Sequence, residues 1–224
     1  MARPNHQHPG DFPTPFPNST PAHAIAEAST QISILADRLR ACFQVVTPTE
    51  ANFGAFGAEL RNILLLAATE FEAQCRAILK ANSYQASAAS QRWNTRDYFK
   101  LEAALRLEDY AISFPEYPWI SPVAPFRRWR SENATTSLGW YDAYNAAKHD
   151  RENSALRATL ERSLEAVIAV VIIGLAQFGI TFLRRAERWR DLFEVYEYPR
   201  WSIGDTHGQL HHPVQPGVGI PYPF

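Results

Sequence analysis

The sequence predicts an all-α fold: a bundle of five helices, with a small hairpin or coil between the third and fourth helices and with extended, proline-rich ends. Prolines are absent from residues 49–114 and 126–198. Long helices fit there because a proline inside a helix removes a hydrogen bond and clashes with the preceding turn. Apolar residues in these stretches recur with the 3.6-residue period of a helix, and residues that favour helix ends precede several of them.

The chain is long enough for one domain with a sizeable core. It has 224 residues, of which 46% are hydrophobic and 20% are charged, the composition of a globular protein. We expect a proline-rich arm over residues 1–20, a helical domain over 21–198 and a proline-rich tail over 199–224. The formal net charge of -1 gives no global attraction to nucleic acid or membrane, so any such contact is expected to be local.

The cysteines and the N-terminus predict a cytoplasmic protein. Cys42 and Cys75 fall on the apolar stripes of two expected helices, which favours reduced core residues and leaves a disulfide between the helices as the alternative. Met1 is followed by prolines and by no apolar segment, so the N-terminus lacks the pattern of a secretory signal.

The first two helices are expected on either side of a short turn. The first begins near Pro21, a favoured first helical position. Its apolar stripe consists of Ile25, Ala28, Ile32, Leu35, Leu39, Cys42 and Val46. The second opens with Thr47-Pro48-Thr49-Glu50, a capping box with a proline just inside it, and its apolar stripe continues to Ile78. Both helices should be long and buried along one face.

The next segments are shorter. A third helix is expected to be capped by Asn94 or Thr95 and to end near Leu107. Residues 110–129 alternate like a strand and return after a proline-broken turn, which predicts a small hairpin or coil. A fourth helix is expected over about residues 138–151.

The fifth helix, from about Thr159 to Phe182, is the most apolar. Its run over residues 166–183 approaches the length of about 18 residues at which a membrane span is suspected. Gly174 and Gln177 interrupt the run, and charged residues directly precede it. These features favour a central helix of the bundle that is buried on all sides.

A polar stripe is expected along the fourth helix. Helical spacing places Asp142, Asn145, His149 and Glu152 on one face. One interpretation is structural: His149 caps the end of the helix or forms a salt bridge there, with Asp150 and Glu152 as its partners.

The other interpretation is that the stripe serves a phosphodiester. A histidine exchanges protons near neutral pH, so His149 would act as the proton-transfer group. Asn145 and the flanking cations Lys148 and Arg151 would donate hydrogen bonds to phosphate oxygens. His149 and Asn145 are therefore the candidate catalytic residues, and Lys148 and Arg151 are candidate binding residues.

A resemblance to a known family rests on the same segment. Tyr144-Asn145-Ala146-Ala147-Lys148-His149-Asp150-Arg151, followed by an apolar helix, resembles the end of a HEPN-type helical bundle, and in particular uncharacterised bacterial proteins of that kind. The similarity covers roughly residues 58–179. It extends to Glu59-Leu60-Arg61-Asn62, Thr69-Glu70-Phe71-Glu72, Asp97-Tyr98-Phe99 and Pro125-Phe126.

This resemblance implies a function. HEPN domains are commonly metal-independent ribonucleases of bacterial stress or defence systems, in which two protomers bring together an arginine, a polar residue and a histidine. It thus implies an RNA partner, a homodimer, and no metal or cofactor. Asn145 matches the polar residue and His149 the histidine, but Tyr144 stands where the arginine would be. Lys148 or Arg151 would have to substitute. Because many members bind RNA without cutting it, cleavage stays open.

Charged residues of the second helix are further candidates. Arg61, Glu70 and Glu72 are candidates for orienting the polar stripe, since a positioned carboxylate can hold one tautomer of an imidazole. The alternative is that they belong to the solvated face of an amphipathic helix.

Two arginine-tryptophan clusters, at residues 127–130 and 184–190, are candidates for gripping a nucleic-acid backbone. Arg127 and Arg184 are the candidate binding residues. The alternative is an exposed helix end whose tryptophans anchor it in the core.

No metal site is expected. His207, His211 and His212 lie among glycines and prolines of the tail and repeat no recognised ligand spacing. The alternative to an RNA-binding protein is a non-enzymatic dimerising or adaptor bundle, whose proline-rich ends embrace a second chain or another protein.

Overall fold

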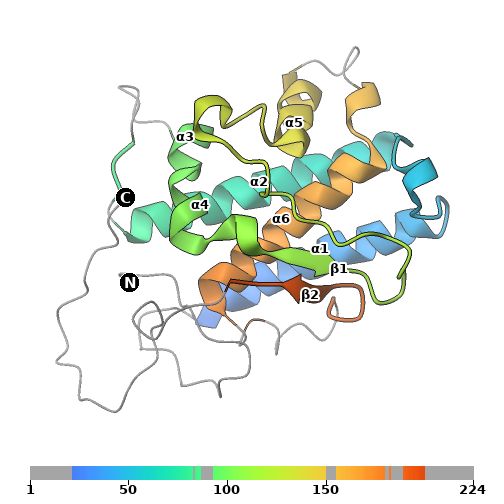
Figure 1. The fold of residues 1–224 in the computed structure, drawn as a ribbon, viewed down its shortest axis with the longest axis horizontal. Helices are drawn as coiled ribbons and strands as arrows, with labels where there is room; N and C mark the ends of the chain where they lie inside the picture. The colour runs from blue at the N-terminus through green and yellow to red at the C-terminus, as the bar shows by residue number, and fades with distance from the viewer. Residues whose placement is uncertain are drawn as a thin grey trace.

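The computed structural model describes residues 22–82, 84–86, 93–149, 155–179, 182 and 189–199. Its α-helices are α1 (Ala22–Phe43), α2 (Ala58–Ala81), α3 (Thr95–Tyr98), α4 (Lys100–Leu105), α5 (Gly139–His149) and α6 (Leu160–Phe178) (Figure 1). Its strands are β1 (Ala111–Ser113) and β2 (Glu194–Glu197). The prediction of a mainly helical bundle is confirmed. The expected arm over 1–20 and the tail beyond residue 199 lie outside the described residues.

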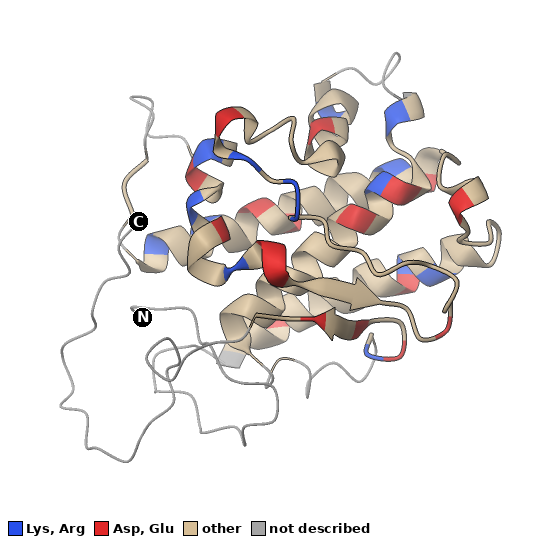
Figure 2. Ribbon diagram, viewed as in Figure 1, with Lys and Arg blue, Asp and Glu red and all other residues tan. Residues whose placement is uncertain are grey.

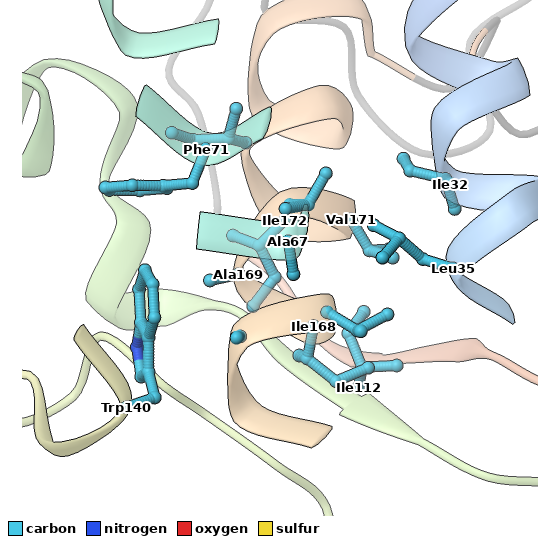
Figure 3. Close-up of a cluster of buried hydrophobic side chains, with 14 of the residues drawn as sticks. Ile32, Leu35, Ala67, Phe71, Ile112, Trp140, Ile168, Ala169, Val171 and Ile172 are labelled. Atoms are coloured by element: carbon cyan, nitrogen blue, oxygen red, sulfur yellow. The ribbon is translucent and has the colours of Figure 1, made fainter. Parts of the chain in front are cut away.

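Helix α6 forms the centre of the molecule, with α1 and α2 packed along it. Every residue from 166 to 176 is buried. Figure 3 shows Ile32 of α1 and Ala67 of α2 facing the α6 residues Val171 and Ile172 from different sides. The apolar run is therefore the buried central helix that the sequence predicts. No helix in the described ranges is long and apolar enough to cross a membrane.

The turn between α1 and α2 differs from the prediction. The Thr47–Glu50 segment leads only into a single 3-10 turn over Glu50–Asn52, and α2 begins at Ala58. The intervening backbone is used differently: the N–H of Leu160 donates to the carbonyl of Ala55 at 2.8 Å, and the next N–H of α6 donates to the carbonyl of residue 53. The first amides of a helix need such external acceptors, so this loop caps α6 and does not extend α2.

The third helix is capped as predicted but is broken. The side chain of Asn94 accepts from the N–H of Arg96, and Asp97 accepts from the N–H of Asn94 at 2.9 Å, which completes a capping box. The helix is interrupted at Phe99, so α3 and α4 are separate. Helix α4 ends at Leu105, because the φ of the next residue, Arg106, is 51° and lies in the left-handed region.

The expected hairpin is reduced to one bridge. Ile112 and Val123 exchange two backbone hydrogen bonds, at 3.0 and 2.9 Å. The main partner of β1 is β2, which pairs with it antiparallel, with Ile112 opposite Val195 and Ser113 opposite Glu194. Figure 1 shows this small sheet on the side of α6 opposite to α5. The sheet and the predicted functional helix are thus on different sides of the bundle.

Candidate functional site

Helix α5 is fixed against α2 at both of its ends. Trp140 is fully buried and meets the ring of Phe71 edge-on, with 5.1 Å between the ring centroids. The hydroxyl of Tyr141 donates to Oε1 of Glu72 at 2.7 Å. One to two turns further along α5, Nη2 of Arg61 donates to the carbonyl oxygen of Ala147 at 2.9 Å. The two helices are therefore antiparallel. The last turn of α5 is held by Arg61 of α2.

The predicted polar stripe lies along the outer side of α5. Asp142 is joined by an ion pair to Arg157, which follows the helix in the chain. Asn145 is half-buried and His149 is exposed. Among the described residues, no side chain bonds to the side chain of either one. Asp150, Arg151 and Glu152, the other expected members of the site, lie outside the described residues.

Lys148 is held on this turn by Tyr144. Its Nζ lies 3.1 Å from the Tyr144 hydroxyl and 5.2 Å from the centroid of the same ring. The hydrogen bond to Tyr144 is the main reason why the pKa of Lys148 is raised above its ordinary value. Tyr144 itself is buried. Tyr144, which stands where an arginine was expected, is not a cation itself but positions the cation of Lys148.

A second set of polar groups surrounds Glu72. Its Oε1 accepts from Tyr141, its Oε2 pairs with Nη2 of Arg76, and Nε of Arg76 donates to the hydroxyl of Tyr98 at 2.9 Å. The charge of Glu72 raises the pKa of Lys148, and the charge of Arg76 lowers it. We call Glu72, Arg76, Tyr98, Tyr141, Tyr144 and Lys148 together the α2–α5 cluster.

Burial sets the protonation of the cluster tyrosines. It raises the pKa of Tyr98 to about 12. Burial also raises the pKa of Tyr141, and the hydrogen bond to Glu72 raises it further because the bond is lost when the phenol ionises. Both phenols therefore carry their protons at neutral pH. Tyr141 acts as a donor to Glu72, and the two cations of the cluster outnumber its single carboxylate.

Sequence reasoning missed Arg76 and Tyr141. A signal for Arg76 was present, because Glu72 and Arg76 stand four residues apart, the spacing of a glutamate-arginine pair on one helix face. Tyr141 gave no comparable signal, since its partner lies 69 positions earlier in the chain.

Arg61 and Glu70, two of the three charged candidates on α2, have different surroundings. Arg61 lies beneath the end of α5, where its bond to Ala147 satisfies a carbonyl that the helix itself leaves open. Glu70 accepts from Gln74 at 2.9 Å, and burial is the main cause of its raised pKa, with a contribution from Glu27 of α1. The structure brings Arg61 and Glu72 to α5 and turns Glu70 toward α1.

The arginine-tryptophan clusters lie elsewhere. Arg127 forms an ion pair with Glu197 of β2. Trp129 is buried, and its Nε1 donates to the carbonyl of Ala134 at 2.8 Å, as expected of a core anchor. Trp189 is also buried, whereas Arg184 lies outside the described residues. Arg127 is not brought to the candidate site.

Arg127 also lines a surface hollow of about 500 Å³. Its lining consists of Arg106, Glu108, Asp109, Arg127, Glu197, Tyr198 and Pro199. Charges of both signs meet there, and Figure 2 likewise shows acidic and basic segments interspersed over the bundle. The mixed charges of the hollow therefore do not favour either an anionic or a cationic ligand.

The part of the chain that the structure describes contains no cluster of metal-binding side chains and no disulfide. No three histidine, cysteine, aspartate or glutamate side chains gather there in a way that could hold a metal ion. Cys42 is half-buried and Cys75 is buried, and both are free thiols. The tail residues His207, His211 and His212 lie outside the described residues.

Comparisons with known proteins add no identity. No protein-family model, no curated protein and no solved structure matches the chain. The class that the structure defines is a helical bundle built around one buried helix, with a cationic cluster between α2 and α5 and an exposed histidine at the end of α5.

Proposed function

We propose that this protein binds RNA at the last turn of α5, as a HEPN-like helical bundle. The observation that carries the proposal is the position of Asn145, Lys148 and His149 on α5 and the exposure of the last two. All three share one turn, Lys148 and His149 are exposed, and no described side chain bonds to Asn145 or His149. An exposed cation next to an exposed imidazole on one helix turn lets both groups reach a phosphodiester from solvent.

Local charge supports a phosphate ligand. The net charge of the whole chain is -1, so attraction must come from particular cations. Lys148 and Arg76 provide two, and Glu72 offsets only one of them. Phosphate contacts from such side chains give sequence-independent affinity that falls as salt rises.

The same residues can support cleavage without a metal. His149 would take the proton of a ribose 2′-hydroxyl as its oxygen attacks the neighbouring phosphorus. The bond from phosphorus to the 5′-oxygen breaks, that oxygen takes up the proton that His149 then carries, and a 2′,3′-cyclic phosphate is left. Asn145 and Lys148 would donate to the phosphate oxygens on which negative charge develops. A setting in bacterial stress or defence, and a homodimer, belong to the proposal through the HEPN resemblance.

A second candidate function, a dimerising or adaptor bundle, is favoured by exposed apolar side chains. Val45, Phe56, Trp119 and Leu156 are 85%, 54%, 54% and 64% exposed. Trp119 donates from Nε1 to the carbonyl of Pro48, and Phe56 forms a bridge with Thr159, so Trp119 and Phe56 are both held at the loop between α1 and α2. A contiguous patch of exposed apolar side chains marks a contact with another protein. Sedimentation of the full chain, with and without RNA, distinguishes this candidate from the RNA-binding proposal. A dimer that binds no RNA would support the dimerising bundle.

The test measures binding and cleavage together. The full chain, Lys148→Gln and His149→Ala are incubated with labelled single-stranded RNA in chelator, with His23→Ala as the control because His23 is exposed on α1. Binding that Lys148→Gln weakens and His23→Ala leaves intact supports the proposal. Products with cyclic phosphate ends that His149→Ala abolishes would extend it to cleavage. Absence of binding by the parent chain would overturn it.

A further inference from the structure

Arg76 has the features of an arginine that is held in place for a ligand. Its guanidinium carries five N–H donors. Nε donates to Tyr98 and Nη2 pairs with Glu72, while the side chain is still 50% exposed. Nη1 has no partner among the described residues. One edge of the group is thus fixed by the protein, and donors are left for an anion.

Three helices contribute to this fixation. Glu72 and Arg76 belong to α2, Tyr98 to α3 and Tyr141 to α5. Tyr141 donates to one oxygen of Glu72, which leaves the other oxygen to pair with Arg76. Glu72 is only 12% exposed, whereas the Arg76 side chain that it pairs with is 50% exposed, so the network fixes a cation at the surface. A chain of bonds from α5 through Glu72 to one half-exposed guanidinium therefore fits preorganisation better than stabilisation alone.

Arg38 of α1, which pairs with Glu59 of α2, provides a comparison. Its Nη1 lies 2.7 Å from Oε1 of Glu59, with the two side chains 42% and 47% exposed. Neither residue has a further hydrogen bond from a tyrosine among the described residues. Arg38 and Arg76 thus carry the same charge, each pair with a glutamate and are similarly exposed, at 42% and 50%. They differ in the supporting network and in the burial of the glutamate, since Glu59 is 47% and Glu72 12% exposed.

We infer that Arg76 is a second phosphate-binding residue of the RNA site, acting beside Lys148, and that Glu72 is the positioning residue that aims it. The inference rests on the proposed function. In it, Arg76 supplies the charge of the HEPN arginine, in whose place this chain has Tyr144. The ligand is a phosphodiester of the bound strand, because a guanidinium matches the geometry of phosphate oxygens with two parallel hydrogen bonds.

Binding of a fluorescent uridine homopolymer at several salt concentrations tests the inference. Arg76→Gln should weaken binding about tenfold, the cost of losing charged hydrogen bonds. It should also lower the slope of log K against log salt by about 0.7, the contribution of one phosphate contact on a single strand. Arg38→Gln, the matched control, should change neither quantity.

Glu72→Gln separates positioning from simple charge. It removes a negative charge, so unspecific electrostatics would strengthen RNA binding. If Glu72 aims Arg76, binding weakens several-fold instead. Circular dichroism checks that each variant is folded, and Arg76→Lys provides a gentler change, which should keep the salt slope and still lose affinity because the fork of donors is gone.

The outcomes distinguish this inference from the proposed function. If the parent chain binds the homopolymer and Arg76→Gln behaves like Arg38→Gln, the role of Arg76 is contradicted while RNA binding stands. Stronger binding by Glu72→Gln would contradict the positioning role. If the parent chain does not bind, both proposals fail.

Discussion

The hydroxyl of Tyr141 donates a hydrogen bond to Glu72 across 2.7 Å, and this bond connects the helix that presents His149 to the helix that presents Arg76. Glu72 is only 12% exposed, so it depends on protein donors in place of water. Tyr141 is the donor from α5, and Arg76 is the cationic partner. The orientation of the candidate site therefore depends on a buried phenol that does not itself reach the proposed ligand.

Tyr141→Phe should destabilise the protein by about 1–2 kcal/mol, because a mostly buried carboxylate oxygen loses its donor. The free energy of unfolding in urea measures this. Tyr196→Phe is the control, since Tyr196 is 60% exposed on β2. Equal stability of the two variants would show that Glu72 does not need the Tyr141 hydroxyl.

Arg61→Gln should loosen the last turn of α5. Its bond to the Ala147 carbonyl is lost, and a helix end without such a partner frays. Hydrogen exchange of the backbone amides over residues 145–149 should become faster, whereas exchange in α6 should stay slow. Unchanged protection at 145–149 would contradict a supporting role for Arg61.

Gly174→Ala should destabilise the core even though alanine favours helix. A Cβ at this position would lie 2.6 Å from the ring of Phe182, and overpacking of a core costs about 1–3 kcal/mol. The gain in helix propensity, about 1 kcal/mol, offsets only part of it. Urea unfolding measures the loss, and Phe182→Leu in the same chain should recover part of it. A more stable Gly174→Ala variant would contradict this packing.

Glu70 should make the protein less stable as pH rises. Burial raises its pKa in the folded protein, above the value of an unfolded chain. Its contribution to stability is then fully present below the unfolded pKa and is lost as pH rises through the folded pKa. Glu70→Gln, which can still accept from Gln74, should raise the free energy of unfolding at pH 7 and remove this part of the pH dependence.

The control for this pH dependence is Glu116→Gln, because Glu116 is exposed. Unfolding is followed from pH 4 to pH 7 for the parent chain and both variants. A parent curve that coincides with that of Glu70→Gln would contradict the role of burial at Glu70.

The sequence predicted the long helices well because their signals are local. The periodicity of α1, α2 and α6 and the capping by Asn94 depend on residues a few positions apart. The pairing of β1 with β2 joins residues about 80 positions apart, and most of β2 is exposed, so neither periodicity nor burial indicated it. The late start of α2 likewise depends on α6, which uses the preceding loop as its cap.

The candidate site was predictable only in part. Asn145, Lys148 and His149 were found because they are neighbours on one helix, and Glu72 because of its charge. The separate environments of Glu70 and Glu72 follow from helix geometry, since residues two apart point to nearly opposite faces. The role of Tyr141 could not be found from sequence, because it depends on how α5 packs against α2.

Photo-cross-linking tests the central claim most directly. The full chain is irradiated with a 4-thiouridine-containing single-stranded RNA, and the cross-linked peptides are located by mass spectrometry. RNA binding at the last turn of α5 predicts cross-links in the peptides that contain residues 144–149 and 72–76, which unlabelled RNA competes away. Cross-links confined to other surfaces, such as the Arg127 hollow, or no specific cross-links at all, would contradict it.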